Sequence, residues 1–193
     1  MSMFKWNFIA IISLLTILLN TPSIYAAEDF FWSDSKPMPS CTTSTDKKPS
    51  KRGIIKDGKR IEIDLPSCEE AKKNLVLVKV NDKYLQTYFG SGAEPFIDKG
   101  STMIPLRAIA DAFGFEVQWD KKEEKITLTK DSMTILMYIG KSEMQVDGKA
   151  VNLEAAVPMI KNNVTFLPVR ELAEILDIKV EWDKSTRTAT FSE

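Results

Sequence analysis

The 193-residue chain contains no histidine. Histidine is the usual general base near neutral pH and the commonest metal ligand in proteins. Its absence excludes Ser-His-Asp and Cys-His catalytic arrangements, and every copper or zinc site that depends on imidazole. Two cysteines remain, which makes a thiolate metal site an unfavourable alternative. We therefore expect neither a metal ion nor any other cofactor.

A strong charge of either sign is also absent, because the formal net charge is −1 and arginine is scarce beside lysine. No basic stripe interleaved with aromatic residues occurs, so nucleic acid is not an expected partner. Apolar residues make up 44% of the chain and charged residues 27%, which is typical of globular proteins. The composition predicts one domain or slightly more.

Long apolar runs are scarce too, and residues 8–19 form the one that stands out. This run is too short to span a bilayer comfortably, since a spanning helix needs about 20 residues. Lys5 precedes it, Pro22 follows it, and Ala26 is a small residue at a suitable cleavage point. The pattern predicts a signal peptide over residues 1–26, with a retained membrane anchor as the alternative. The cleaved protein is expected to be secreted or cell-wall associated, without membrane contact.

Cys41 and Cys68 both follow the predicted signal peptide. An even number of cysteines in an exported chain favours a disulfide, which would stabilise the fold by roughly 3 kcal/mol, over two free thiols. Residues 27–74 are expected to form a flexible linker and a cysteine-containing hairpin segment, because much of this region is polar. The aromatic cluster within residues 29–34 is expected to dock on the folded domain rather than contact a partner.

The most informative feature is an internal repeat. The sequence TMIPLRAIADAFGFEVQWDK at 102–121 recurs as TFLPVRELAEILDIKVEWDK at 165–184. An apolar stripe with helical spacing follows the proline in each copy, and alternating apolar residues then indicate a strand. Turn signals at 57–58, 81–82 and 147–148 predict β-hairpins over 53–65, 76–86 and 144–153.

One such unit buries too little apolar surface to fold alone. We therefore expect an α+β fold in which two related units of β-hairpin, helix and β-strands form antiparallel sheet packed on short helices. The units cover about residues 75–130 and 131–193. The signal peptide and the Cys-containing N-terminal segment precede them.

The repeated pattern resembles the copper amine oxidase N-terminal-domain-like family, also called the stalk domain, of exported Gram-positive bacterial proteins. The motifs VN-x-K, P-x-I, T-x-x-P-L/V-R and V-x-WD-K carry the resemblance over residues 76–191. It implies a peripheral, non-catalytic domain with antiparallel sheet wrapped around helix. Catalysis in the oxidases implied by the name uses three histidines and a quinone from an Asn-Tyr motif, and this chain has neither. The resemblance therefore implies a domain and no activity.

Equivalent residues in the two copies are expected to be structural. Each arginine is expected to pin the start of a helix to the end of a strand, through the aspartate or through loop carbonyls, with anion capture as the alternative. Each tryptophan is expected in the core, because it alternates in phase with apolar residues. The set comprises Pro105, Arg107, Trp119 and Asp120, and their equivalents Pro168, Arg170, Trp182 and Asp183.

Three extra residues fall within residues 86–95 of the first copy and place Tyr88 and Phe89 beside two glycines. Aromatic residues on a loop are a recurring binding device, and packing onto the domain edge is equally compatible with the sequence. The candidate binding residues are Tyr84, Tyr88, Phe89 and Trp32. No catalytic residue is predicted.

The sequence thus favours an exported, non-catalytic interaction or scaffold domain at the cell envelope. Its expected partner is an envelope protein or a wall polymer. The alternative is a module that binds wall glycan or peptidoglycan. A histidine-free hydrolase is less favoured, because it would need two carboxylates facing one cleft, one of them with a raised pKa.

Overall fold

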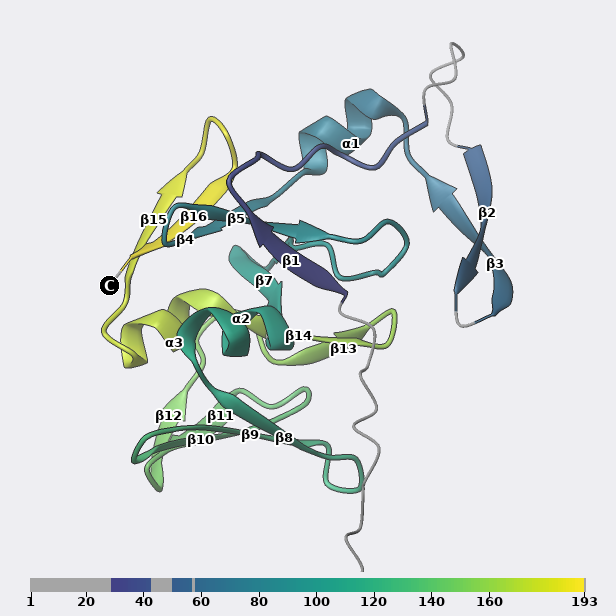
Figure 1. Cartoon of the computed structure of the whole chain (residues 1–193). Helices are drawn as coiled ribbons and strands as arrows, with labels where there is room; N and C mark the ends of the chain where they lie inside the picture. Colours follow the sequence, from purple (N-terminus) through teal and green to yellow (C-terminus); the bar gives the residue numbers. More distant parts are fainter. Residues whose placement is uncertain (1–28, 43–49, 57, 193) are drawn as a thin grey trace, which may run out of the picture.

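The computed structural model describes residues 29–42, 50–56 and 58–192. The predicted signal peptide lies outside these residues. Two five-stranded sheets enclose the helices α2 (Leu106–Phe113) and α3 (Val169–Ile175) from opposite sides (Figure 1). We call them the upper and lower sheets, as they lie in Figure 1. No helix in the described part of the chain is long and apolar enough to cross a membrane.

Both five-stranded sheets combine strands from the two halves of the chain. The upper sheet has the order β1 (Phe30–Ser33), β5 (Lys83–Thr87), β4 (Leu77–Val80), β16 (Thr188–Ser192) and β15 (Lys179–Asp183). The lower sheet has the order β12 (Lys149–Asn152), β11 (Glu143–Val146), β10 (Met133–Tyr138), β9 (Lys125–Lys130) and β8 (Glu116–Asp120). The first hairpin, β4–β5, therefore lies beside the last two strands of the chain.

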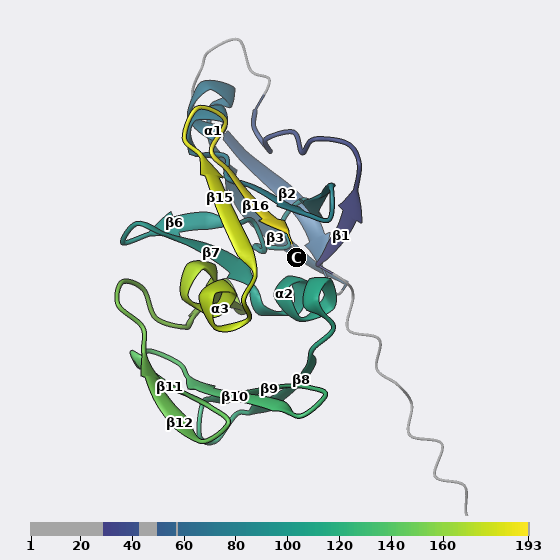
Figure 2. The ribbon, with the colours of Figure 1, turned by 90° about the vertical axis from the view of Figure 1, so that its left-hand side faces the viewer.

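A four-stranded middle sheet joins the halves a second time. Its order is β13 (Met159–Lys161), β14 (Val164–Pro168), β7 (Ser101–Pro105) and β6 (Phe96–Asp98). The strands that lead into the two helices pair directly here, with Leu167 opposite Ile104. Figure 2 shows this sheet beside the helices. The series strand, helix, strand, strand occurs twice, as β7–α2–β8–β9 and β14–α3–β15–β16.

The expected α+β class is confirmed, and every pair of named strands but one is antiparallel. β16 runs parallel to β4, with Ala189 opposite Val78. The sheets are therefore mixed rather than purely antiparallel. A parallel pair needs a long crossover connection, and here the whole chain between β4 and β16 supplies it.

The turn and helix signals of the sequence correspond to real elements. Asn81 and Asp82 have φ of 47° and 66°, and Asp147 and Gly148 have φ of 50° and 77°, as tight two-residue hairpin turns require. Helix α2 begins after Pro105 and ends at Gly114, whose φ of 70° is the left-handed conformation that glycine adopts without a Cβ penalty.

One hydrophobic cluster connects both helices with both five-stranded sheets. Phe113 of α2 lies edge-on to Phe191 of β16, with ring centroids 6.1 Å apart. Ile109 of the same helix is buried together with Ile126 and Ile135 of the lower sheet. The helices therefore supply apolar surface to two sheets at once, so neither sheet has a complete core without them.

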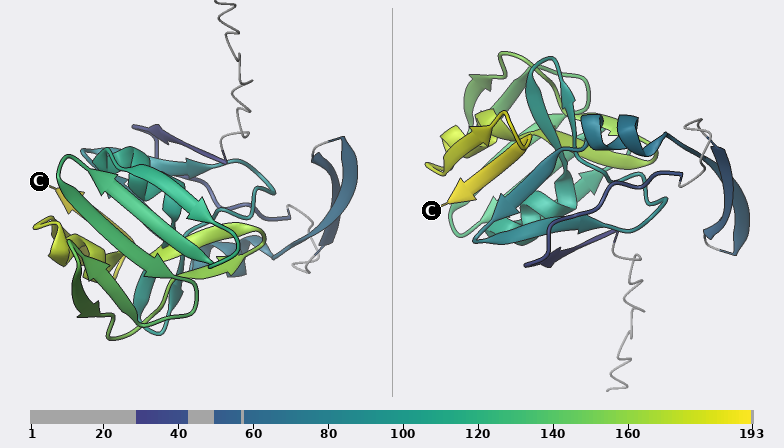
Figure 3. Two further views of the ribbon diagram at one scale, coloured as in Figure 1. Left: turned by 90° about the horizontal axis from the view of Figure 1, so that it is seen from below. Right: turned by 90° about the horizontal axis from the view of Figure 1, so that it is seen from above.

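The N-terminal segment is more ordered than the composition predicts. Phe30–Ser33, expected within a flexible linker, form the edge strand β1 and pair with β5. The hairpin of β2 (Ser50–Lys56) and β3 (Lys59–Leu65) projects from the side of the body (Figure 3). A short helix, α1 (Cys68–Asn74), follows it. Phe30 and Trp32 of the aromatic cluster thus dock on the domain, as predicted, whereas Phe31 stays exposed.

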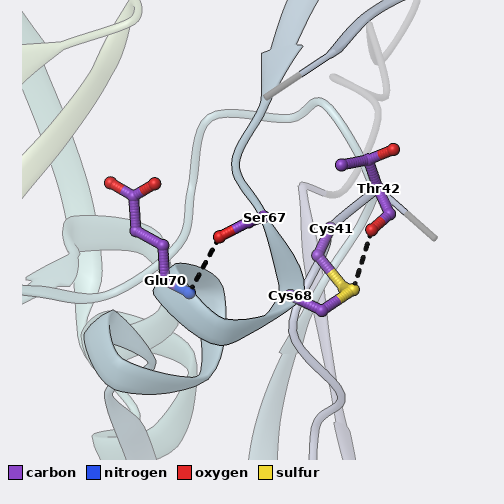
Figure 4. The surroundings of a disulfide bond; sticks show 5 residues. All are labelled: Cys41, Thr42, Ser67, Cys68 and Glu70. Carbon is purple, nitrogen blue, oxygen red and sulfur yellow. Dashed lines mark hydrogen bonds between the residues drawn. A yellow bond between two sulfur atoms is a disulfide. The ribbon is translucent and has the colours of Figure 1, made fainter. Parts of the chain in front are cut away.

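The predicted disulfide between Cys41 and Cys68 is present (Figure 4). Cys68 is the first residue of α1, and the Oγ of Ser67 caps this helix by accepting a hydrogen bond from the backbone N–H of Glu70 at 3.2 Å. The Thr42 carbonyl oxygen lies 3.0 Å from the Cys68 Sγ, a close contact rather than a hydrogen bond because a disulfide sulfur carries no hydrogen. The bond holds segment 37–42 beside the base of the β2–β3 hairpin.

Candidate binding groove

A groove of about 1030 Å³ opens between three segments that are distant in the sequence. One wall is strand β3 of the β2–β3 hairpin, the second is the disulfide-held segment 37–40, and the third is the loop of residues 86–95; residues within 71–76 and 162–163 also line the groove. Apolar and polar groups share its lining almost equally. The apolar residues include Pro37, Met38, Ile61, Ile63, Leu65 and Phe89, and charged groups lie at Lys59, Asp64 and Glu94. A cleft that combines apolar surface with convergent polar groups is typical of binding sites.

Gly90 determines how closely the loop approaches the hairpin. Its φ is +75°, and a Cβ at this position would collide with the Cδ1 of Ile54. The backbone conformation therefore favours glycine, and a Cβ would in addition displace the end of the Ile54 side chain. The turn that contains Gly90 is closed by the backbone N–H of Ser91, which donates to the carbonyl of Tyr88 at 3.0 Å. The loop that contains the predicted aromatic residues is thus packed against the hairpin.

Three exposed aromatic residues adjoin the groove, and we call Phe31, Tyr88 and Phe89 the aromatic rim. Phe89 lines the groove itself, Tyr88 precedes it in the chain, and Phe31 lies opposite the lining residue Gln86 in the β1–β5 pair. The rings of Phe31 and Tyr88 are 5.3 Å apart and tilted by 44°. The side chains remain 42%, 50% and 47% exposed, respectively. Large exposed aromatic residues grouped beside a groove that is partly apolar indicate an interaction surface.

The other two predicted binding residues have different surroundings. Trp32 points to the core side of β1, and its Nε1 donates a hydrogen bond to the Oδ2 of Asp111 in α2 at 2.8 Å. Tyr84 lies opposite Ser33 in the β1–β5 ladder, and the Nζ of Lys79 is 5.9 Å from its ring centroid. The structure therefore groups Tyr88 and Phe89 at the groove and gives Trp32 a fastening role.

The expectation that Trp119 and Trp182 lie in the core is wrong. They are 41% and 38% exposed. Each ring does lie on the expected face of its sheet. Trp119 is opposite the buried residue Ile126 and Trp182 is opposite the buried residue Ala189, so both rings are on the core-facing side. The reason for the exposure is that β8 and β15 are edge strands, where one side of an inward-pointing ring has no neighbouring strand.

The aspartates after the tryptophans organise turns and do not pair with the arginines. Asp120 Oδ1 accepts hydrogen bonds from the backbone N–H groups of Lys122 and Glu123, at 2.9 and 3.1 Å. Among the described residues no ion pair joins an aspartate of the repeat to Arg107 or Arg170, so the expected ion-pair pin is not formed.

Asp183 forms a denser version of this turn. Its carboxylate accepts from the Oγ and N–H of Ser185 at 2.6 and 2.8 Å, and from the Oγ1 and N–H of Thr186 at 2.8 and 3.3 Å. The side-chain hydrogen bond from Ser185, followed by that from Thr186 and the two backbone bonds, lowers the pKa of Asp183 to about 2.

Comparison with known proteins agrees with the sequence motifs. The family model of the copper amine oxidase N-terminal domain matches residues 79–191, which is more than half of the chain. The chain belongs to this family. The copper amine oxidase N-terminal domain is a non-catalytic domain. Within the described residues no group of three or more Cys, Asp or Glu side chains is arranged to hold a metal ion.

A curated relative comes from Brevibacillus choshinensis and is described as a protease inhibitor. It is 28% identical over 85 residues, an alignment that covers 43% of this chain and 26% of the relative. The similarity therefore spans about a quarter of that protein's length.

Much of the groove lies outside the segment that matches the copper amine oxidase N-terminal domain. The hairpin β2–β3 and segment 37–40 precede residue 79, and so does Phe31. Sequence reasoning singled out Trp32 and missed Phe31, although alternation along β1 would have placed the two rings on opposite faces. It did not identify the hairpin as a wall, because no local pattern shows which distant segments will meet.

Proposed function

We propose that this chain is an exported, non-catalytic binding domain of the cell envelope that holds a segment of a partner protein. The observation that carries the proposal is the groove of about 1030 Å³ with the aromatic rim at its edge. Pockets for small molecules measure about 300–1,000 Å³, so this groove is large enough for several residues of an extended chain. The rim supplies rigid aromatic anchors of the kind that dominate interface energies.

Two further observations support the proposal. The copper amine oxidase N-terminal domain is non-catalytic, which favours recognition over turnover. The disulfide between Cys41 and Cys68 suits an oxidising, extracytoplasmic location, as does the predicted signal peptide. The relative described as a protease inhibitor makes an extracellular protease the first class of partner to test.

A second candidate function is binding of wall glycan. The exposed rings of Tyr88 and Phe89 favour it, because the apolar face of a sugar ring packs on aromatic side chains. The two functions differ in the material that the protein binds and share the same surface.

The test is to incubate the tagged protein separately with envelope proteins, with secreted proteins including proteases, and with purified cell-wall sacculi. The Tyr88→Ala/Phe89→Ala variant is expected to lose at least about tenfold in affinity for the protein fraction, with an unchanged melting temperature. The matched control is Val117→Ala, which removes an exposed apolar side chain from β8, a strand that contributes no residue to the groove.

Saturable binding to sacculi alone, abolished by the rim variant, would replace the protein partner by the wall glycan. Binding that the rim variant retains in full would contradict the assignment of the groove to either material.

A further inference from the structure

A second hollow, of about 250 Å³, lies on a different part of the surface and shares none of its lining residues with the groove. It forms where the β6–β7 hairpin meets α3, the edge strand β15 and the neighbouring strand β16, a junction that Figure 2 shows in the foreground. Three of its lining residues are cationic: Arg170, Lys184 and Arg187. No Asp or Glu is among them.

The acidic side chains of β15 do not neutralise this hollow. Val180 and Trp182 line it, and alternation along the strand therefore turns Glu181 and Asp183 to the opposite face. Both acids are also engaged there. Glu181 pairs with Lys179 at 2.6 Å, and Asp183 accepts its hydrogen bonds within the following turn. Among the side chains that the structure describes, the three cationic groups thus face a space that no acidic residue lines.

One of the cations is held in position by the fold. The Nε of Arg187 donates a hydrogen bond to the carbonyl oxygen of Leu75 at 3.2 Å, which links the β15–β16 turn to the chain just before β4. This bond uses one of the five donors of a guanidinium and fixes the plane of the others. A planar, pre-oriented guanidinium suits the oxygen atoms of a carboxylate or phosphate.

The remainder of the hollow is apolar with a few small polar groups. Val169, Val180 and Phe191 contribute aliphatic and aromatic surface, and Trp182 adds a half-exposed indole. Thr102 supplies a hydroxyl from β7. A site of this kind binds a ligand that has both an apolar face and a negative charge at its rim.

We propose that this hollow binds an anionic sugar unit, a pyranose that carries a carboxylate or a phosphate. The ring's apolar face would pack on Trp182, and the anionic group would lie against Arg170, Lys184 and Arg187. The volume fits one such unit, since it corresponds to roughly eight water molecules at about 30 Å³ each. A slender acidic side chain of a protein would leave the apolar surface beside Trp182 uncovered.

The internal repeat contains a natural comparison. In the first copy the positions equivalent to Arg170, Trp182 and Lys184 are Arg107, Trp119 and Lys121, so these residues are retained. The position equivalent to Arg187, however, is Glu124. Replacing a cation by an acid makes the first copy unsuitable for an anion. The proposal therefore assigns binding to the second copy alone.

The experiment follows the tryptophan indole N–H signals of the purified protein by NMR. The added probes are glucuronate and glucose 6-phosphate, and the comparison probes are neutral glucose and inorganic phosphate. We expect saturable shifts of the Trp182 signal, with the Trp119 signal unaffected, for both anionic sugars. Neutral glucose and inorganic phosphate should each bind at least about tenfold more weakly, because each lacks one of the two kinds of contact.

The variant Arg170→Gln/Lys184→Gln should weaken glucuronate binding by roughly tenfold or more, and added salt should weaken wild-type binding. Arg107→Gln/Lys121→Gln is the matched control, since it removes the same charges from the first copy, and it should bind within about twofold of wild type. Equal shifts at Trp119 and Trp182, equal affinity for neutral glucose, or equal affinity for inorganic phosphate would each overturn the proposal. The groove variant Tyr88→Ala/Phe89→Ala should leave these shifts unchanged, which separates this site from the proposed partner groove.

Discussion

Asp183 is an exposed carboxylate whose environment is nevertheless strongly structured. Its hydrogen bonds from Ser185 and Thr186 close the turn between β15 and β16. The same turn places Lys184 and Arg187 in the cationic hollow. Each hydrogen bond favours the charged form of the carboxyl, so the pKa of Asp183 falls from 3.8 to about 2. The hydrogen bonds that close the turn are therefore also the cause of the lowered pKa of Asp183.

A pH dependence follows from this lowered pKa. The stability contributed by ionised Asp183 is fully present above pH 4 or so, and it is lost as the pH falls through the folded-state pKa of about 2. The difference in urea midpoint between wild type and Asp183→Asn should therefore shrink as the pH is lowered from about 4 to below 2. Ser185→Ala should raise the pKa of Asp183 in a carboxyl NMR titration. A wild-type titration near 3.8 would show that the turn is open in solution.

Trp119 and Trp182 show the limit of residue patterns in a single sequence. Period-two alternation correctly predicted the face on which each ring lies, because that depends only on the strand itself. Exposure depends in addition on whether a neighbouring strand follows, and both strands are at sheet edges. An edge position is a property of the whole topology, and no residue of β8 or β15 encodes it.

At the scale of elements, β1 illustrates how a short strand is held. It has four residues and lies at the edge of the upper sheet, where strands are weakly supported. Phe30 and Trp32 point to the core, and the indole of Trp32 is fastened to Asp111 of α2. The strand is thus anchored by one ladder and one side-chain hydrogen bond.

Loss of that hydrogen bond should loosen β1. We expect Trp32→Phe to lower the free energy of unfolding by about 1 kcal/mol, since the carboxylate of Asp111 loses its donor. Amide exchange in residues 84–87 should also accelerate, because these residues pair with β1. Trp119→Phe is the control, as it shortens an exposed tryptophan on the edge strand β8. Equal destabilisation by both changes would contradict the fastening role of Trp32.

Elements with strong local signals were predictable, and those without them were not. The hairpin turns at 81–82 and 147–148 and the helices after Pro105 and Pro168 follow from turn chemistry and apolar spacing. Strand β10 and helix α1 were not predicted. β10 lies at the start of the second unit and inserts between β11 and β9, whereas the upper sheet has no strand at the corresponding place. An element without a counterpart in the first unit has no second copy to reveal it.

At the scale of the whole molecule, the two halves are interlaced rather than adjacent. Each five-stranded sheet takes strands from both halves, and the middle sheet joins β7 to β14. The sequence repeat showed that two units must pair to bury a core, and it did not show which strands they exchange. The same limit applies to the groove, whose three walls are brought together by the disulfide and by the close approach of Gly90 to the hairpin.

The most direct test of the binding account is backbone amide hydrogen exchange of the protein, alone and with the bound envelope protein. Binding in the groove predicts slower exchange in residues 86–95 and in β3, with the lower sheet β8–β12 unchanged, because a partner in the groove excludes water from its walls. Protection confined to the lower sheet, or spread evenly over the molecule, would contradict the assignment of the groove as the binding surface.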